Sequence, residues 1–262
     1  MTIQSRALGR APAPFAPRHA ADAWFFPAMT ALVWLGVIAG FGGEMWRLSK
    51  AGQLSYPLIV HVHAAVFTGW LVLFTAQVAL VRRGQVALHR RLGMIGMGVA
   101  AVMTALGPLT AFYMQAHALG TPKSDPPFLA VPLSDILSFA GLILAGYRFR
   151  SDPAAHKRLM LLATIAVADA GFGRWTLALF GDWVMRTLGA GFVGSLAVGN
   201  SLSIPALLAV PIHDLVTRGR VRPVVAIATA WAVGWQVLAT ALYLQPGWVA
   251  LTKHFVTWLA TL

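Results

Sequence analysis

Seven apolar stretches fill most of this 262-residue chain, and each is long enough to cross a lipid bilayer. A transmembrane helix needs about 20 predominantly apolar residues. The sequence therefore predicts an all-α fold, a polytopic transmembrane bundle of seven spanning helices. The predicted spans are Trp24–Trp46, Pro57–Val81, Leu92–Ala116, Ala130–Phe149, Leu159–Phe180, Val193–Val216 and Pro223–Leu244.

Composition supports a membrane protein and excludes several other classes. Hydrophobic residues make up 58% of the chain and charged residues 11%, whereas about a quarter of the residues in soluble domains are charged. The net charge of +12 comes from Lys and Arg at the ends of spans, which predicts membrane lipids, and not nucleic acid, as partners. Because the chain has no cysteine, disulfides, thiolate metal sites and iron–sulfur clusters are excluded.

The distribution of basic residues predicts how the chain is oriented in the membrane. They gather in the tail and in the turns after spans two, four and six. Cytoplasmic loops carry an excess of Lys and Arg, so we expect a bacterial inner-membrane protein with a cytoplasmic N-terminus and a periplasmic C-terminus.

Residues 1–22 are predicted to form a disordered tail and residues 23–245 the seven-helix domain. Residues 246–262 are too short to span and, with Trp248 and Trp258, predict an interfacial helix.

An internal repeat relates the basic turns to one another. RRGQVALHRRL at Arg82–Leu92 matches FRSDPAAHKRL at Phe149–Leu159, with His89 and His156 at equivalent positions. LVTRGRV at Leu215–Val221 matches LVRRGQV at Leu80–Val86 in all but two positions. We therefore expect one leading helix followed by three related helical hairpins.

Several polar side chains fall inside the apolar spans, where each ionised group costs about 2.5–3.5 kcal/mol at mid-helix. Asp135 and Arg174 are therefore expected to face the bundle interior, where they can pair. Asp169 lies nearer the membrane centre, a position typical of proton carriers. These three are the predicted catalytic residues. At ~1.5 Å of rise per residue, the polar layer around them also includes His63, Asn200, His61 and Tyr113.

Histidines are the candidate metal ligands in a chain without cysteine. His61 and His63 are two residues apart, so on a regular helix their side chains point to nearly opposite sides. Both reach one ion only if the helix unwinds near Pro57. Hydrogen-bonded histidines near the interface explain the pattern equally simply. His213 is the third predicted metal ligand.

The repeat-equivalent His89 and His156 are the predicted cofactor ligands at the basic turns. Together with Arg90 and Arg158 they predict a b-type haem whose propionates pair with the basic residues, or a histidine-bound transition metal. A second interpretation is that each histidine only begins a helix at the headgroup layer, where the adjacent basic residues reach lipid phosphate.

The strings HVHAAVFTGWLVLFTAQ, LHRRLG, HKRLMLLAT and HDLVTRGRVRP together resemble a group of uncharacterised bacterial multi-pass membrane proteins over spans two to seven. The resemblance implies a multi-pass fold and no particular activity. The short HRxLG and HKRLM strings are also similar to parts of cytochrome-b561-like and ferric-reductase-like haem families. Those families place paired ligand histidines in facing helices, and spans four, five and seven contain no histidine.

Three functions follow from these patterns. The first is a metal or haem protein that carries out membrane redox chemistry or oxidises a lipophilic substrate. The second is a proton-coupled transporter or channel, with its polar site in the outer half of the bundle. The third is a non-catalytic accessory or assembly subunit that binds other membrane proteins.

Overall fold

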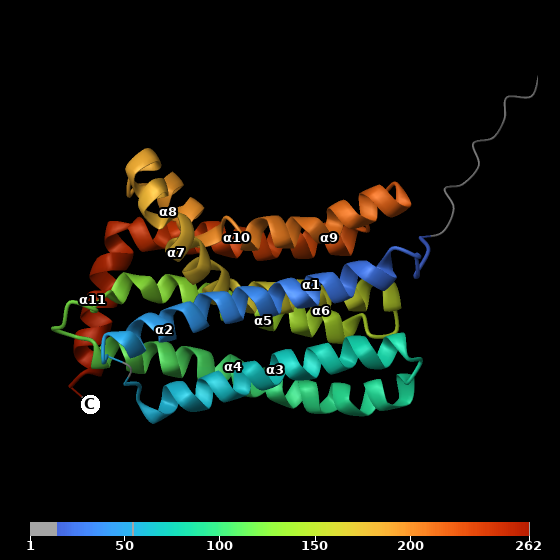
Figure 1. Ribbon diagram of the computed structural model, residues 1–262, viewed down its shortest axis with the longest axis horizontal. Helices are drawn as coiled ribbons and strands as arrows, with labels where there is room; N and C mark the ends of the chain where they lie inside the picture. The colour runs from blue at the N-terminus through green and yellow to red at the C-terminus, as the bar shows by residue number, and fades with distance from the viewer. Residues whose placement is uncertain (1–14, 54, 262) are drawn as a thin grey trace, which may run out of the picture.

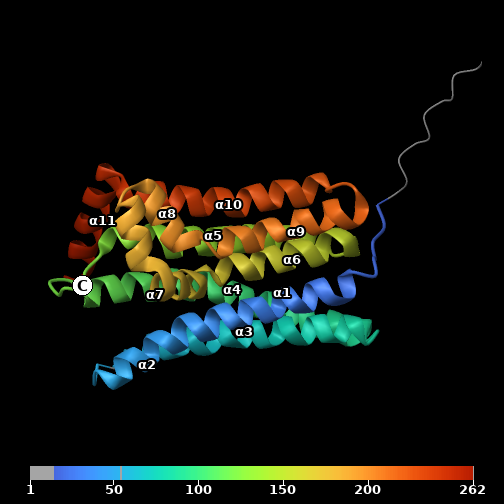
Figure 2. The same ribbon diagram turned by 45° about the horizontal axis from the view of Figure 1, so that its top comes forward.

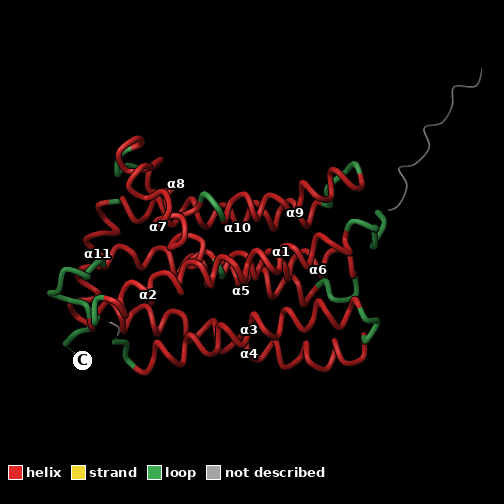
Figure 3. The backbone as a smooth tube through the Cα atoms, viewed as in Figure 1, coloured by secondary structure: helices red, strands yellow, loops and turns green. Residues whose placement is uncertain are grey.

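The computed structural model describes residues 15–53 and 55–261, and within these ranges every regular element is helical (Figure 3). A π-helical segment, η1 (Ile38–Gly42), joins the first two helices, and a 3-10 turn, η2 (Pro126–Leu129), precedes the fifth. The helices are α1 (Asp22–Val37), α2 (Gly43–Lys50), α3 (Leu58–Arg82), α4 (Val86–His117), α5 (Ala130–Arg148), α6 (Pro153–Val167), α7 (Asp169–Leu188), α8 (Phe192–Asn200), α9 (Ser203–Arg218), α10 (Pro223–Leu244) and α11 (Pro246–Leu259).

Five helical segments in the described part of the chain are long and apolar enough to cross a membrane. They correspond to predicted spans one to four and seven, with ends that differ by a few residues. The all-helical class is therefore confirmed, and the fold is compatible with a multi-pass membrane protein. The five segments are Asp22–Lys50, Leu58–Arg82, Val86–His117, Pro126–Arg148 and Pro223–Leu244.

Predicted span six is not a straight helix. Its residues form α8 and α9, which meet at a bend of 68° after Asn200. Proline has no N–H, so Pro205 cannot donate the helical hydrogen bond to the carbonyl of Ser201, and the helix breaks there. The described residues therefore contain five spans, or six if the bent pair is counted as one. The predicted number of seven is not confirmed.

Predicted span five, Leu159–Phe180, is also broken. It divides into α6 and α7 at Ala168, immediately before Asp169. Gly171 and Gly173 follow in the first turns of α7, and glycine weakens a helix by about 1 kcal/mol per residue. The prediction of one continuous span is wrong because apolar content alone does not reveal a break inside an apolar run.

The segment α7–α8 is a hairpin that turns away from the long axis of the bundle (Figure 1). It packs against the rest of the molecule through glycines. A Cβ atom added to Gly40 in η1 would lie 2.1 Å from the carbonyl oxygen of Gly171, so the two backbones are in direct contact. Within the hairpin, Gly173 lies similarly close to Gly199.

The three basic turns lie together at one end of the bundle, which we call the basic end, and α11 crosses the opposite end (Figures 1 and 2). Gly84 and Gly219 occupy equivalent places in the repeat, and both adopt positive φ values, +72° and +67°. This backbone region strongly favours glycine, so the matched RG pairs build matched turns. The hairpins α3–α4, α5–α6 and α9–α10 thus occur where the repeat predicts them.

The core is centred on α6, which packs against α5, α9 and α10. Leu159, Leu161, Leu162 and Ile165 of α6 have no exposed surface. Of the predicted disordered tail, residues 1–14 lie outside the described residues. The remainder packs on the basic end, where Lys157 donates to the carbonyl of Pro17 and Arg218 to that of Ala16 (3.0 and 3.1 Å).

Candidate functional site

The candidate site lies where the two broken spans meet α5 and α10. Asp169 begins α7 directly after the first break, and its side chain is buried. The Gln236 amide of α10 donates to Asp169 Oδ1 at 3.0 Å. The Ser203 hydroxyl, at the start of α9 after the second break, lies close to the Asp169 side chain. Asp169 therefore lies near both breaks and is hydrogen-bonded to α10.

A second carboxylate, Asp135 of α5, is buried close enough to Asp169 for the two charges to repel each other. Among the described residues, no Lys, Arg or His forms an ion pair with either carboxylate. A buried charge without a partner is costly. The site therefore holds two buried acidic groups that no described basic side chain pairs with.

Two buried amide oxygens near the breaks have no hydrogen-bond partner among the described residues, Gln236 Oε1 and Asn200 Oδ1. Gln236 is 4% exposed and Asn200 7%. Asn200 is the last residue of α8, and its backbone carbonyl accepts from the Ser203 hydroxyl at 3.4 Å. One unsatisfied oxygen thus belongs to the amide that donates to Asp169, and the other lies at the end of α8, at the second break.

Arg174 is predicted to meet Asp135, and the structure places it elsewhere. Its Nε donates to Glu44 Oε2 at 2.6 Å and its Nη1 to the carbonyl of Ala170 at 3.0 Å. The guanidinium also lies over the Phe41 ring, 4.5 Å from the ring centroid. Pairing with Asp135 is therefore wrong, because Arg174 points from α7 towards η1 and α2.

Part of the predicted outer polar layer is not assembled. His61 is exposed, whereas His63 is partly buried and stacks on Phe67 with 3.9 Å between ring centroids. The two imidazoles thus occupy different environments on a regular helix, as their spacing predicts. Tyr113 is 45% exposed and stacks on His117. Asn200 is the one member of this layer that lies next to Ser203 in the candidate site.

At the basic end, His89 and His156 do come together. Their ring centroids are 6.1 Å apart and the planes are nearly perpendicular. His156 Nδ1 is 2.8 Å from the carbonyl oxygen of Gly146, and Gln77 donates to the backbone carbonyl of His89 at 3.1 Å. Arg90 is exposed beside them.

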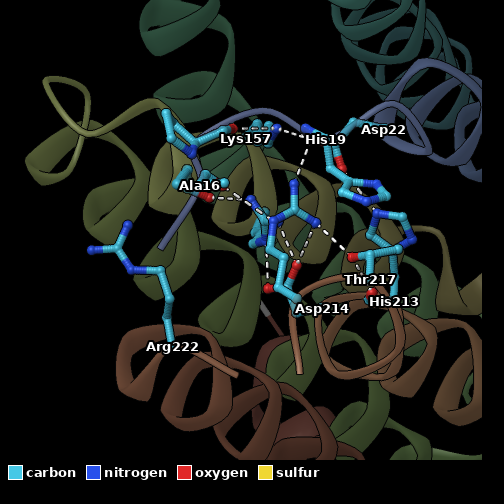
Figure 4. A network of polar contacts seen from close by, with 12 residues as sticks. Ala16, His19, Asp22, Lys157, His213, Asp214, Thr217 and Arg222 are labelled. Atoms are coloured by element: carbon cyan, nitrogen blue, oxygen red, sulfur yellow. Dashed lines mark hydrogen bonds and ion pairs between the residues drawn. The ribbon is translucent and has the colours of Figure 1, made fainter. Parts of the chain in front are cut away.

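His213 does not join this pair. Its Nε2 lies 2.9 Å from Asp22 Oδ1, and its ring stacks on Phe25 at 4.0 Å between centroids. Asp22 also accepts from Lys157 and Arg218, both at 2.7 Å (Figure 4). In the part of the chain that the structure describes, no group of three His or acidic residues is arranged to hold a metal ion.

Arg158 is predicted to pair with a haem propionate, but its guanidinium is hydrogen-bonded within the protein. It has no exposed surface, and its Nε donates to Asp214 Oδ2 at 2.6 Å. Its Nη2 pairs with the other Asp214 oxygen, and its Nη1 donates to the carbonyl of Ala154 at 2.7 Å. The guanidinium therefore joins α6 to α9 and presents no free edge to a propionate.

Outside the spans, the pKa values of three side chains, Asp152, Arg222 and Tyr56, are shifted. The hydrogen bond from Arg222 lowers the pKa of the Asp152 carboxyl, and the same contact raises the pKa of Arg222. Burial raises the pKa of Tyr56, and the nearby negative charge of Glu44 raises it further. The Tyr56 shift indicates that Glu44 acts on the surface between α2 and α3 as well as on Arg174.

Sequence reasoning missed three residues of the candidate site and its surroundings. Gln236 and Ser203 are polar residues inside apolar runs, and Glu44 is an acid within the first span. Their intramembrane position was the available signal. Comparison of the chain with protein families, with curated proteins and with solved structures finds no match.

Proposed function

We propose that this chain is a proton-coupled membrane transporter in which Asp169 takes up and releases the coupling proton. The observation that carries the proposal is the pair of buried carboxylates, Asp135 and Asp169, without a basic partner among the described residues. This is the second of the three functions that the sequence suggests, and the broken helices favour it.

The energetic argument concerns the charge of the pair. An ionised carboxylate at mid-helix costs about 2.5–3.5 kcal/mol on insertion scales, and two such charges close together repel each other. A proton on one carboxyl group removes the repulsion between the two and the cost of burying that group's charge. Asp169 is the better candidate because it lies at the break and accepts a hydrogen bond from Gln236 of another helix.

The breaks themselves support transport. Secondary transporters commonly place coupling-ion and substrate sites near the bilayer midplane, between interrupted helices whose freed backbone groups face the site. Irregular backbone at that depth is tolerated only inside protein or around a water-filled cavity. Here both breaks, at Ala168 and at Ser201–Leu202, adjoin the Asp169 site. A rearrangement of the α7–α8 hairpin then changes access to that site.

The same proposal includes location and orientation. The chain lies in the bacterial inner membrane, with the basic end and the N-terminus cytoplasmic and with α11 at the periplasmic interface. The positive-inside rule supports this orientation, since all three basic turns share one end.

Infrared spectroscopy of the purified protein tests the coupling group without a known substrate. The carbonyl stretch of a protonated buried carboxyl is expected to lose intensity as the pH is raised, and Asp169→Asn is expected to remove that change. Asp182→Asn, which alters an exposed carboxylate on the same helix, is the matched control and should leave the band unchanged. A titrating band that persists in both Asp169→Asn and Asp135→Asn would overturn the proposal.

A flux assay extends the test to transport. In proteoliposomes loaded with a pH-sensitive dye, Asp169→Asn is expected to abolish pH-dependent flux while the variant remains folded and monodisperse in detergent. Flux that keeps its pH dependence in Asp169→Asn would rule out coupling through this residue.

One observation favours the redox function as a second candidate, the close approach of His89 and His156. A hydrogen bond from Nδ1 to the Gly146 carbonyl would leave Nε2 of His156 available to a metal. An optical spectrum and elemental analysis of purified protein test this candidate, which predicts haem absorption or stoichiometric metal. The accessory-subunit function stays a prediction, and co-purification with a larger membrane complex tests it.

A further inference from the structure

A cleft of about 330 Å³ with charged and apolar walls lies between the η1–α2 segment and α7. Its charged lining consists of two acids and two bases, and the apolar part is contributed by α7. The lining includes Gly40, Glu44, Arg47, Arg174, Leu177 and Asp182. The formal charge of the lining is therefore balanced, and one acid and one base, Glu44 and Arg174, form an ion pair.

Arg174 is fixed in this cleft independently of Glu44. Its Nη1 is bonded to the Ala170 carbonyl at 3.0 Å, and its guanidinium stacks over Phe41 at 4.5 Å. The bond from Nε to Glu44 is the remaining contact, and both partners are about one third exposed, 35% and 31%. Ion pairs this exposed contribute about 0–1 kcal/mol. Glu44 can therefore be exchanged for a ligand while Arg174 keeps its position.

We infer that this cleft binds a zwitterion, with the anionic group of the ligand on Arg174 and its cationic group on Glu44. The argument is charge conservation. An anion alone would displace Glu44 and leave its carboxylate without a partner, and a cation alone would do the same to Arg174. A molecule that carries both groups replaces one ion pair with two.

The volume of the cleft and its apolar wall indicate which class of zwitterionic ligand it can bind. Its volume is near the lower end of the ~300–1,000 Å³ range of small-molecule sites. Leu177, Ala178 and Leu179 add an apolar wall. A neutral α-amino acid with an aliphatic side chain has the matching chemistry, and the headgroup of a zwitterionic phospholipid presents the same pair of charges. The test separates these two sources.

This inference rests on the proposed function, because it assigns the substrate class of the same transporter. The physical link is the Ala170 carbonyl, which accepts from Arg174 one residue after Asp169. A ligand on Arg174 therefore acts on the first turn of α7, beside the break where the coupling proton resides.

Binding to the purified protein in lipid-depleted detergent tests the inference without transport. The probes are leucine, 4-methylvalerate, which lacks the ammonium group, and 3-methylbutylamine, which lacks the carboxylate. Short-chain phosphatidylethanolamine and phosphatidylglycerol form the lipid arm. We expect leucine to bind at least about tenfold more tightly than either partial probe, because each partial probe displaces one member of the Glu44–Arg174 pair without giving it a new partner.

Substitutions of Glu44 and Arg174 are expected to affect the two partial probes in opposite ways. Glu44→Gln should weaken leucine binding about tenfold or more and spare or strengthen 4-methylvalerate, because the competing carboxylate is gone. Arg174→Gln, or Arg174→Lys if the former does not fold, should weaken leucine and spare the amine. Arg186→Gln, an exposed arginine on α7 outside the cleft, is the matched control and should behave as wild type.

The outcomes distinguish the two proposals. Preference for phosphatidylethanolamine over phosphatidylglycerol, with the same variant pattern and no leucine binding, assigns the cleft to a lipid headgroup and supports the zwitterion inference. Failure of both leucine and phosphatidylethanolamine to bind wild type overturns it, as does equal binding to all variants. Because binding at fixed pH needs no coupling proton, a normal infrared titration of Asp169 alongside absent binding would overturn this inference alone.

Discussion

Replacing Asp214 by Asn is expected to destabilise the fold more than any single change at the exposed ion pairs. The substitution keeps the size of the side chain and removes its charge. Arg158, which has no exposed surface, then keeps its hydrogen bond to the Ala154 carbonyl and loses a charged partner on two of its nitrogens. Arg218 loses a weaker contact of 3.5 Å and keeps Asp22 at 2.7 Å.

The expected loss of free energy of unfolding follows from the burial of the Arg158–Asp214 ion pair. Removing one partner of a buried ion pair costs about 3–5 kcal/mol, because the remaining charge stays buried without compensation. Replacing both partners by apolar residues of similar volume is often neutral or stabilising, by about 1–4 kcal/mol. We therefore expect Asp214→Asn to lower the free energy of unfolding by about 3–5 kcal/mol, and Arg158→Met combined with Asp214→Leu to recover most of that loss.

Equilibrium unfolding in mixed micelles, followed by tryptophan fluorescence, measures these differences. Arg222→Gln is the matched control, since it breaks an ion pair at the same end whose partners are 26% and 32% exposed. The Arg222–Asp152 pair should contribute about 0.2–1 kcal/mol to the free energy of unfolding. If Asp214→Asn cost no more than Arg222→Gln, or if the double replacement were as damaging as the single one, the argument from burial would be wrong.

Two further predictions concern the backbone contact and a helix cap. Gly40→Ala should destabilise the fold by about 1–3 kcal/mol, because its Cβ would lie 2.1 Å from the Gly171 carbonyl oxygen, whereas Gly42→Ala, with open space around its Cβ, should be neutral or slightly stabilising in the same unfolding assay. Asp152 accepts two backbone N–H groups at the start of α6, so Asp152→Ala should cost about 0.5–2 kcal/mol. Because Arg222 lowers the pKa of Asp152, the stabilisation from this carboxylate is complete above its unfolded pKa of about 3.9 and is lost as the pH falls through the lowered folded value. Asp152→Asn should remove this acid-limb loss from a pH series of melting temperatures, and an unchanged acid limb would contradict the assignment.

Much of the fold was predictable because apolarity and turn chemistry act locally. The five long spans need only a run of apolar residues, and the matched turns at Gly84 and Gly219 need a residue that accepts positive φ. The two breaks were not predicted. Pro205 gives a local reason for one of them, but proline is also common in uninterrupted membrane helices. The break at Ala168 has no comparable marker in the sequence.

The candidate site was predictable in part for the same reason. The cost of a buried charge identified Asp135 and Asp169 without any knowledge of packing. Partner choice depends on how the helices rotate and cross, which depth along a span does not give. Arg174 therefore pairs with Glu44 and not with Asp135, and Asp169 is bonded by Gln236 of α10.

In the proposed mechanism, the position of Asp169 at a helix start is what makes its charge adjustable. The first turn of α7 presents backbone N–H groups whose dipoles favour a negative charge there, while burial and the repulsion from Asp135 oppose it. Protonation of Asp169 therefore depends on the balance of these opposing effects, which a displacement of α7 changes. Such displacements are available because the α7–α8 hairpin is interrupted on both sides, before Asp169 and after Asn200. The Ser203 hydroxyl donates to the Asn200 carbonyl at the second interruption and lies close to Asp169 at the first. A change of charge on Asp169 would therefore act on both ends of the hairpin. Two continuous spanning helices would not provide this coupling.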